Sequence, residues 1–409
     1  MTLSIREIGE NIKNSPFFKG SLSFEEGLSE RTTMKVGGGA SLFVEPEDSA
    51  SLAFALKTLW ANGTRLFVLG GGSNVVVSDS GFDGAVVSTR RLEGVSASYT
   101  DGATSYADRA PSSADRAASY ADGATSSADR AASYADGATS SAKGAPVLLT
   151  AGAGTLTDAV VLYAAEHALT GIECFASLPG TVGGAAYMNA RCYEKSLSDV
   201  ISSVTYLDAS DGFAEKTLTV RESDWSYKHS PFTGTKNIVT SVTFALSLSD
   251  SSPKTLLEKC SFYEEDRRKK GHFKFPSAGS VFKNNRNFGK PTGALIDECG
   301  LKGTLRGGAQ IAPWHGNFII NRGSASAQDI KELVTLAQTA VREFILLMPG
   351  TRESSTPSRI SSTWIAMPAR ISLVSSAMLR ASVSVVCNWS ILAFNRVMFT
   401  PDCSLCMLP

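Results

Sequence analysis

Clusters of glycine are the residues of this chain whose type and spacing most favour phosphate-binding chemistry. In FVLGGGSNVVVSD, Gly70, Gly71 and Gly72 separate two runs of apolar and β-branched residues. Glycine accepts backbone angles that other residues cannot, and it lets main-chain N–H groups approach a ligand closely. The segment therefore predicts either a phosphate cradle, to which Ser73 and Asn74 add side-chain donors, or a tight turn that binds nothing.

The best-known phosphate-binding loops do not account for this segment. The dinucleotide fingerprint requires a third glycine where Val75 stands, and a helix where the sequence continues as a strand. A Walker loop is excluded because no Gly-Lys-Ser/Thr sequence follows. Three further clusters also adjoin expected strands: KVGGGA (35–40), LPGTVGGAAYMNA (178–190) and LRGGAQIAPWHGNFIIN (305–321). Several such loops in one chain suggest a long ligand whose pyrophosphate lies across them.

Short strands and helices in alternation are expected to position these loops. RLFVL and NVVVS are predicted as buried strands on either side of the triple glycine, and TLTDAVVLYAAEHALTG as a helix that closes at Gly171. VISSVTYLDASDGFAEKTLTV predicts a hairpin that turns at Asp211-Gly212. A helix that stops at Gly63 is predicted ahead of RLFVL, and one of its faces is formed by Leu52, Leu56, Leu59 and Trp60.

The composition indicates an ordinary globular protein of two or three domains. The chain has 409 residues, of which 43% are hydrophobic and 19% charged. Lysine plus arginine equals aspartate plus glutamate, 39 each, so no charge excess points to nucleic acid or anionic lipid. Charges in MTLSIREIGENIKN argue against a signal peptide, and no run of about 18 apolar residues predicts a membrane span. We therefore expect a cytoplasmic protein.

Neither the cysteines nor the histidines predict a metal site. The seven cysteines are an odd number without regular spacing, which favours reduced thiols. The single CxxC, Cys403 with Cys406, has no second pair and no neighbouring histidine. The four histidines form no ligand pair.

Residues 98–146 form an internal repeat that differs from the rest of the chain. A seven-residue unit such as SYADGAT or SSADRAA recurs through it, with tyrosines as its only large side chains. So little apolar surface cannot offset the entropy of ordering the chain, and repeated glycines oppose a coiled coil. We expect a mobile insertion at a hairpin tip, because both flanks resemble strands. Lengthening a loop from about 5 to about 50 residues costs only about 2 kcal/mol.

Residues 346–409 also differ from the rest of the chain in their sequence pattern. Helical periodicity holds through AQDIKELVTLAQTAVREF and then gives way to scattered serine and arginine without a period of 3.6 or 2.0. The segment resembles the product of a reading-frame slip more than an evolved domain. We expect it to be unpacked.

Five motifs together resemble one enzyme family. RTTMKVGGGA, LGGGSNVVVSDSGFDG, GIECFASLPGTVGGAAYMNA, PSAGSVFKN and GLKGTLRGGAQIAPWHGNFIIN look like the ordered motif series of UDP-N-acetylenolpyruvoylglucosamine reductase. That flavoprotein completes UDP-N-acetylmuramate in peptidoglycan synthesis. The resemblance covers about residues 30–344 without the repeat.

The resemblance implies an α+β fold. An FAD-binding module of two α/β subdomains, of the vanillyl-alcohol-oxidase type, would occupy 30–250 and be interrupted by 98–146. A lead-in, 1–29, would precede it, and a smaller α/β substrate domain, 251–345, would follow. We place this boundary near Asp250, where a charged helix begins at Pro253. The atypical tail, 346–409, lies beyond the resemblance.

The resemblance also implies FAD as cofactor and NADPH as co-substrate. NADPH would reduce FAD and leave, and a UDP-sugar enolpyruvyl ether would then take its place and receive the hydride. The residues implied in FAD binding lie in the glycine clusters: Val36, Gly37, Gly38, Gly70, Gly71, Gly72, Ser73, Asn74, Gly180, Thr181, Gly183 and Gly184.

Two catalytic residues are implied by motif position. GSVF matches the family's proton-donor motif and assigns that role to Ser280, where the plain alternative is a serine that satisfies a turn beside Gly279. SYKHSPF stands where the family usually has Tyr-Arg-x-Ser, so Lys228 replaces an arginine and is otherwise a solvated surface lysine. Lysine keeps the charge but loses the planar fork. The family's C-terminal glutamate has no match here, and Glu353, the nearest one downstream, is not assigned the role.

Substrate contacts are implied for a second group of residues. FKNN matches a substrate-domain motif, so the residues from Lys283 to Asn285, Asn284 among them, are expected near the UDP diphosphate. Tyr227 is expected to bind the substrate. Lys302, Gln310 and Asn317 are weaker candidates. Two other functions stay open from the sequence: another FAD-dependent oxidase or dehydrogenase of the same superfamily, and a catalytically impaired relative. The sequence does not indicate an oligomeric state.

Overall fold

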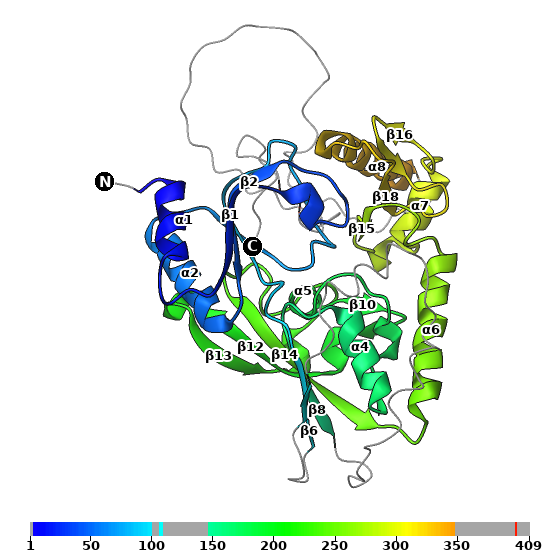
Figure 1. The fold of residues 1–409 in the computed structure, drawn as a ribbon. Helices are drawn as coiled ribbons and strands as arrows, with labels where there is room; N and C mark the ends of the chain where they lie inside the picture. The colour runs from blue at the N-terminus through cyan, green and yellow to red at the C-terminus, as the bar shows by residue number, and fades with distance from the viewer. Residues whose placement is uncertain (1–2, 100–105, 109–145, 348–396, 399–409) are drawn as a thin grey trace, which may run out of the picture.

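A computed structural model describes residues 3–99, 106–108, 146–347 and 397–398. The chain forms two α/β subdomains followed by a smaller α/β domain. The smaller domain includes β16 (Leu305–Arg306) and α8 (Ala327–Leu347) and lies at the upper right of Figure 1. The predicted α+β class, with two α/β subdomains ahead of a smaller domain, is therefore confirmed.

The first subdomain is a four-stranded sheet covered by two helices. The helices α1 (Ile5–Lys13) and α2 (Ser49–Ala61) begin at the caps Ser4 and Asp48, whose side chains accept backbone N–H bonds. β1 and β2 are antiparallel, and β5 runs parallel to both β2 and β3. The strand order is β1 (Gly20–Gly27), β2 (Gly39–Pro46), β5 (Phe82–Ser88) and β3 (Leu66–Leu69).

The predicted buried face of α2 is confirmed in three of its four positions. Leu52, Leu56 and Leu59 are at most 1% exposed and pack into the core beneath the sheet. Trp60 is 44% exposed instead. Its ring meets the edge of Phe213 and lies 4.3 Å from Lys236 Nζ, so it covers the rim of the core rather than its centre.

The second subdomain is a larger antiparallel sheet with three helices packed on it. Its main strands follow the order β13 (Ala214–Thr219), β12 (Ile201–Asp208), β14 (Ile238–Leu248), β8 (Val147–Gly152), β6 (Val95–Tyr99) and β7 (Tyr106–Asp108), and β9 (Leu169–Thr170) pairs with β14. The helices are α4 (Thr157–Glu166), α5 (Val182–Tyr187) and α6 (Pro253–Lys269).

Two local predictions in this subdomain have different outcomes. The hairpin of β12 and β13 is confirmed, and Gly212 takes the left-handed conformation at its turn. The helix α4 ends at Glu166, before the predicted stop at Gly171. It ends earlier because Ala168 has a φ of 56° and the chain then enters β9, which pairs with β14.

The repeat is inserted where its flanks predict. β6 pairs antiparallel with β8, and Tyr99 stands opposite Val147 on either side of the insertion. Three residues of the repeat form β7 and pair with the other edge of β6. This pairing differs from the expectation of a wholly mobile insertion. Positions 100–105 and 109–145 of the repeat lie outside the described residues.

The third unit is an antiparallel sheet with two helices. Its strand order is β15 (Ser277–Ser280), β18 (Phe318–Asn321), β17 (Ala309–Ile311) and β16 (Leu305–Arg306). The helices are α7 (Thr292–Glu298) and α8 (Ala327–Leu347). In the view of Figure 1, α6 runs between this unit and the second subdomain.

The helix α6 packs with the second subdomain. Its buried residues Leu256, Leu257 and Cys260 join the core of the large sheet. The sequence places the domain boundary near Asp250, before this helix. If the boundary followed core packing alone, it would lie after the helix, near Gly271.

Short elements complete the described chain. The two-residue strands are β4 (Val76–Val77), β10 (Arg191–Cys192), β11 (Lys195–Ser196) and β19 (Val397–Met398). The 3₁₀ helices are η1 (Leu28–Arg31), η3 (Glu173–Phe175), η4 (Leu197–Asp199), η5 (Ala209–Asp211), η6 (Glu222–Asp224) and η7 (Arg286–Phe288).

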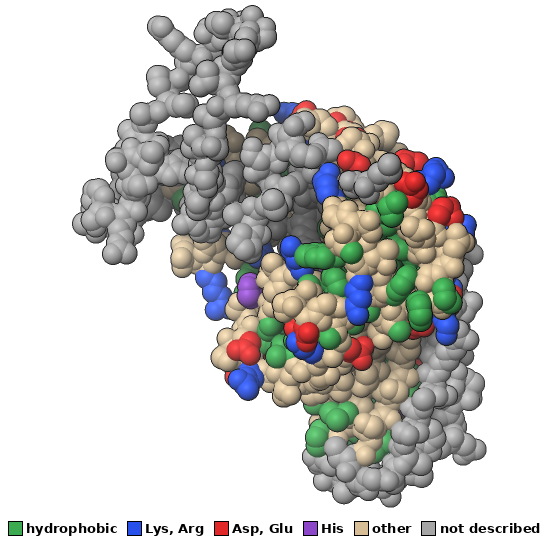
Figure 2. All heavy atoms as spheres, turned by 90° about the vertical axis from the view of Figure 1, so that its left-hand side faces the viewer, with side chains coloured by type: hydrophobic (Ala, Val, Ile, Leu, Met, Phe, Trp, Pro, Cys, Tyr) green, Lys and Arg blue, Asp and Glu red, His purple; other side chains and the backbone are tan. Residues whose placement is uncertain are grey.

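The expectation of an unpacked tail falls mostly outside the described residues, as do Glu353, Cys403 and Cys406. Within 346–409 the structure describes the end of α8 and β19, and β19 pairs parallel with β4. Across the described part of the chain, no helix has the length and apolar character to cross a bilayer. On the face shown in Figure 2, acidic and basic side chains are interspersed.

Candidate functional site

Two of the glycine clusters lie directly against each other. A Cβ on Gly71 would stand 2.7 Å from Gly180 Cα, and one on Gly70 would stand 2.8 Å from Thr181 Oγ1. The Ser73 hydroxyl donates to the Pro179 carbonyl over 3.1 Å. Real Cβ atoms do not approach backbone this closely, so glycine is needed for the two loops to meet.

A third glycine cluster joins the same place. Gly72, with φ of 64°, approaches the backbone of η1 so closely that a Cβ would stand 2.0 Å from the Arg31 carbonyl oxygen. Gly37 and Gly38 pack in the same way against Val77 and Gly81. The loops around 31–39, 70–81 and 180–184 therefore converge, as the sequence suggests for a ligand that lies across several loops.

The converged loops have backbone donors for a phosphate. In the described part of the chain, no hydrogen bond is recorded from the N–H groups of residues 71–74, whereas the Gly72 carbonyl accepts from Thr33 N at 3.1 Å. On the neighbouring loop, Thr181 caps α5 by accepting from Gly184 N, and Gly183 N donates to the strand-end carbonyl of Ala153. The N–H groups of residues 71–74, rather than those of Gly183 and Gly184, therefore suit a pyrophosphate. Val36 is different, because its side chain is 2% exposed and packs in the core of the third unit.

The third unit is fastened to these loops by specific hydrogen bonds. Thr33 Oγ1 donates to the Ser277 carbonyl at 2.7 Å, and Asn321 Nδ2 donates to the carbonyls of Met34 and Lys35. Asp79, which follows β4, accepts from two N–H groups at the start of α8. A carboxylate at a helix N-terminus is favourable. The domain interface is thus built on the glycine loops themselves.

Ser280 lies at the exposed end of β15, beside this interface. Gly279 has a φ of 74°, and the pairing of β15 with β18 is irregular between Ser277 and Ser280. Behind the strand, the amide of Asn317 forms two 2.9 Å bonds with the backbone N–H and carbonyl of Phe282. Ser280 is therefore presented at a bulged strand end that is held from behind.

Lys228 lies in a tight turn that the second subdomain holds in place. Ser226 and His229 bridge the turn, and the Ser230 hydroxyl, fully buried, donates to the Tyr187 carbonyl at 2.7 Å. Lys228 itself has a φ of 57°, an unusual conformation for a residue with a side chain. The half-buried lysine has a lowered pKa, first because of burial and then because of the nearby charges of Lys283 and Arg191, although Cys192 opposes the shift.

The same turn contacts the predicted substrate-binding loop. The Tyr227 hydroxyl accepts from the backbone N–H of Asn284 at 3.5 Å. The Asn284 side chain accepts from Thr292 N, and the Thr292 hydroxyl donates to the Lys283 carbonyl. Burial lowers the pKa of Lys283. Tyr227, Lys228, Lys283 and Asn284 are thus brought together from two domains.

Three weaker candidates have partners within their own domain. Gln310 donates to the Gly303 carbonyl and accepts from Arg322. The Asn317 side chain is hydrogen-bonded to the backbone N–H and carbonyl of Phe282. Lys302 is paired with Asp297. These contacts favour a scaffold role for all three. Among the described residues, no three His, Cys, Asp or Glu side chains gather in a metal-binding group.

Sequence reasoning missed the residues that join the domains. Thr33 and Asp79 stand inside motifs that the sequence analysis quotes, but a threonine and an aspartate in a loop have no spacing signal for a contact more than 200 positions away. The pairing partners, Ser277 and the start of α8, become neighbours only after folding. The cation Arg191, beside Lys228, was missed for the same reason.

This fold and site define a class: FAD-binding oxidoreductases whose cofactor module is completed by a small second domain. Residues 40–105 match a model described as an FAD binding domain, and residues 271–346 match "UDP-N-acetylenolpyruvoylglucosamine reductase, C-terminal domain".

Similar proteins identify the family. A UDP-N-acetylenolpyruvoylglucosamine reductase of Treponema denticola is 39% identical over 346 residues, covering 81% of this chain and 93% of the relative. The protein of that name in Treponema pallidum is 33% identical and covers 77% of this chain and 88% of its own. The crystal structure of the Thermus caldophilus reductase covers 79% of this chain and 96% of its own, at 29% identity and a TM-score of 0.55. The chain belongs to the UDP-N-acetylenolpyruvoylglucosamine reductase family and is an FAD-dependent oxidoreductase.

Proposed function

We propose that this chain reduces UDP-N-acetylglucosamine enolpyruvate to UDP-N-acetylmuramate in the cytoplasm, with NADPH as electron donor, for peptidoglycan precursor synthesis. The observation that carries the proposal is the position of Thr33. Its N–H donates to the Gly72 carbonyl, and its hydroxyl donates to the Ser277 carbonyl of β15. One residue thus links the glycine loops of the FAD module to the strand that presents Ser280.

The glycine loops would hold the pyrophosphate of FAD. The N–H groups of residues 71–74 would be its donors, and the loop at Gly180–Gly184 packs against them. FAD, when bound, supplies hydride transfer to the vinyl carbon, and the protein supplies orientation, charge stabilisation and a proton.

Ser280 would deliver the proton. A serine hydroxyl is a weak acid, so it serves only when the carbon that accepts the proton is strongly basic. An enolpyruvyl group that has received hydride at its terminal carbon carries such a charge on the neighbouring carbon, shared with the carboxylate. The bulged end of β15 would hold the hydroxyl against this carbon.

The cations opposite would stabilise the same charge. Lys228 reaches the site from the turn of the FAD module, and Lys283 reaches it from the small domain. In the described residues neither forms an ion pair with a carboxylate. Preorganised positive charge in a partly buried site stabilises a developing anion strongly. Tyr227 and Asn284, in contact with each other, would close the substrate site between the domains.

Product analysis tests this function. The purified protein is incubated anaerobically with NADPH and UDP-N-acetylglucosamine enolpyruvate, and the nucleotide sugars are separated by mass spectrometry. We expect a product that is two hydrogens heavier than the ether and coelutes with UDP-N-acetylmuramate. An unchanged ether, with oxygen reduced to hydrogen peroxide by NADPH once air is admitted, would instead identify an oxidase.

A further inference from the structure

A second cation stands beside Lys228, on the short hairpin of β10 and β11. Arg191 is half-buried, and its guanidinium meets Glu194 at 2.6 Å. The Glu194 side chain is 91% exposed, so water screens this ion pair and its contribution is small. Glu194 therefore holds Arg191 only weakly, and a further anion can compete for the guanidinium.

The hairpin is fixed to the turn that carries Lys228. Asn189, 2% exposed, donates through Nδ2 to the Ser226 carbonyl at 2.9 Å and accepts through Oδ1 from Ser198 N at 3.1 Å. The Tyr187 carbonyl accepts from both Ser230 and Thr233. The two segments are thus one rigid assembly, in which Arg191 and Lys228 keep their relative positions.

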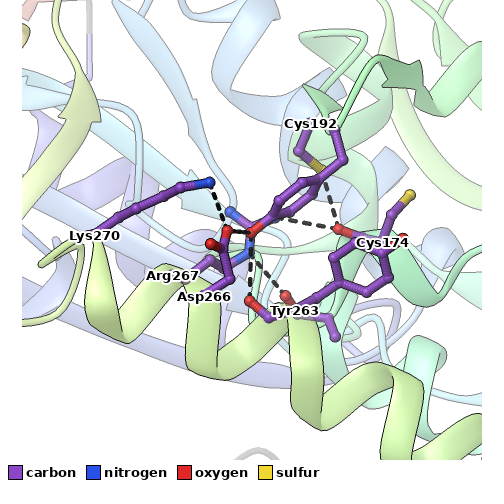
Figure 3. Close-up of polar contacts among 8 residues, drawn as sticks. Cys174, Cys192, Tyr263, Asp266, Arg267 and Lys270 are labelled. Carbon is purple, nitrogen blue, oxygen red and sulfur yellow. Dashed lines mark hydrogen bonds and ion pairs between the residues drawn. The ribbon is translucent and has the colours of Figure 1, made fainter.

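The far side of the hairpin is braced on α6. Tyr193 donates to Asp266 at 2.6 Å, and Asp266 also pairs with Lys270 at 2.6 Å (Figure 3). On the same helix, the buried guanidinium of Arg267 donates to the carbonyls of Cys174 and Ala176. Such support on both sides is what holds a functional side chain in one geometry.

Backbone strain gathers in the same place. Four residues that carry side chains have positive φ values here: Asn189 (41°), Tyr193 (47°), Glu194 (65°) and Lys228 (57°). Each such conformation costs about 1–3 kcal/mol and persists where the surrounding structure enforces it, often at binding sites. The strain lies at the two segments that carry Arg191 and Lys228.

The charges of this assembly are unbalanced. Burial lowers the pKa of Lys228, and the nearby charges of Lys283 and Arg191 lower it further, although Cys192 acts in the opposite direction. Like charges in a half-buried site oppose one another until an anion enters. Only Arg191 has a planar fork, which suits a carboxylate in two parallel bonds, whereas lysine offers a point charge.

We infer that Arg191 binds the carboxylate of the enolpyruvyl group, beside Lys228, and supplies the forked contact that a lysine at position 228 cannot. This inference rests on the proposed function, because it takes the substrate from there. Arg191 acts as a substrate-positioning residue from the FAD module, opposite Ser280 of the small domain.

Two ligands that share UDP and differ in the carboxylate test the inference. UDP-N-acetylmuramate has the carboxylate and UDP-N-acetylglucosamine lacks it. For Arg191→Ala, we expect affinity for the first to fall about 10- to 100-fold and affinity for the second to change less than about twofold. Arg342→Ala, an exposed position on α8, is the matched control and should alter neither. Calorimetry on flavin-loaded protein gives both affinities.

Rescue separates a specific role from a structural one. Lys228→Arg in the Arg191→Ala background should restore most of the lost affinity, because it returns a fork to the same site. Equal loss for both ligands, or loss for neither, would overturn the inference. If Arg191→Ala does not retain flavin, the two affinities are measured with Arg191→Gln instead, and the same unequal loss is expected. Turnover of the enolpyruvyl ether by the wild type decides the proposed function separately, and wild-type protein that binds neither ligand would overturn both.

Discussion

At the scale of single residues, the proposed mechanism combines a weak acid, Ser280, with the cation Lys228. Ser280 stands at a strand end that Asn317 supports from behind, and Lys228 stands in a strained turn braced by Ser230. The sequence motifs name Ser280 and Lys228, but they do not show that the two come from different domains. Nor do they show that Asn317 serves the strand rather than the substrate.

Replacing Ser280 should separate the two half-reactions. In Ser280→Ala, NADPH should still bleach the flavin at the wild-type rate, because this step needs no proton from the serine. Reoxidation by the enolpyruvyl ether should fall roughly 10²- to 10⁴-fold, as for other acid–base residues. Stopped-flow absorbance measures both steps, and Ser277→Ala on the same strand is the control. If Ser280→Ala is reoxidised at the wild-type rate, Ser280 is not the proton donor.

His272 should make folding stability dependent on pH. Burial, with Arg267, His315 and Lys270 nearby, lowers its pKa to about 4. Between the ordinary value of about 6.5 and this value, the unfolded chain binds a proton that the folded chain does not, so stability falls as pH falls through that window. Because the ring is only part-buried, water screens the effect, and this pH-dependent term amounts to about 1–2 kcal/mol.

His272→Gln removes that term and should therefore lose less stability than the wild type between pH 6.5 and pH 4. Urea unfolding at several pH values measures the difference, with His229→Gln, at an exposed position, as control. Parallel curves for wild type and His272→Gln would show that this histidine does not contribute.

At the scale of elements, glycines decide how closely the loops approach. The triple glycine alone leaves a phosphate cradle and a tight turn both open, and the structure adds that its neighbours are other loops. Gly71→Val should displace the loop at Gly180 and yield soluble protein without flavin, because its Cβ would stand 2.7 Å from Gly180 Cα. Gly27→Val is the control, since a Cβ there meets nothing within 4 Å. Absorbance of the purified variants reports flavin content, and full occupancy in Gly71→Val would contradict this role.

The repeat should be dispensable for cofactor binding. Because Tyr99 and Val147 are paired across the insertion, an Asn-Gly turn can join β6 to β8 in place of residues 100–146. The deletion removes β7 from an outer edge, so flavin content should be unchanged and the melting temperature nearly so. Loss of flavin, or a large fall in melting temperature, would show that the repeat packs against the enzyme.

At the scale of the whole molecule, the order of elements could be predicted better than their contacts. Periodicity identifies α2, α6 and the hairpin of β12 and β13, because each buries its apolar face locally. It cannot assign α6 to the core of the second subdomain, since Leu256 and Leu257 would suit either neighbour. It also cannot find Thr33, Asp79 or Arg191, whose partners lie in other segments. The function could be predicted from the family motifs, whereas the contacts between distant segments became known only from the structure.

The most direct test of the central claim is an anaerobic titration of the reduced flavoprotein. Protein bleached with NADPH and freed of excess nucleotide is titrated with UDP-N-acetylglucosamine enolpyruvate while flavin absorbance is followed. The account predicts complete return of the oxidised spectrum at one equivalent of ether per flavin, with no oxygen present. A spectrum that stays reduced in excess ether and recovers only when air is admitted would contradict it.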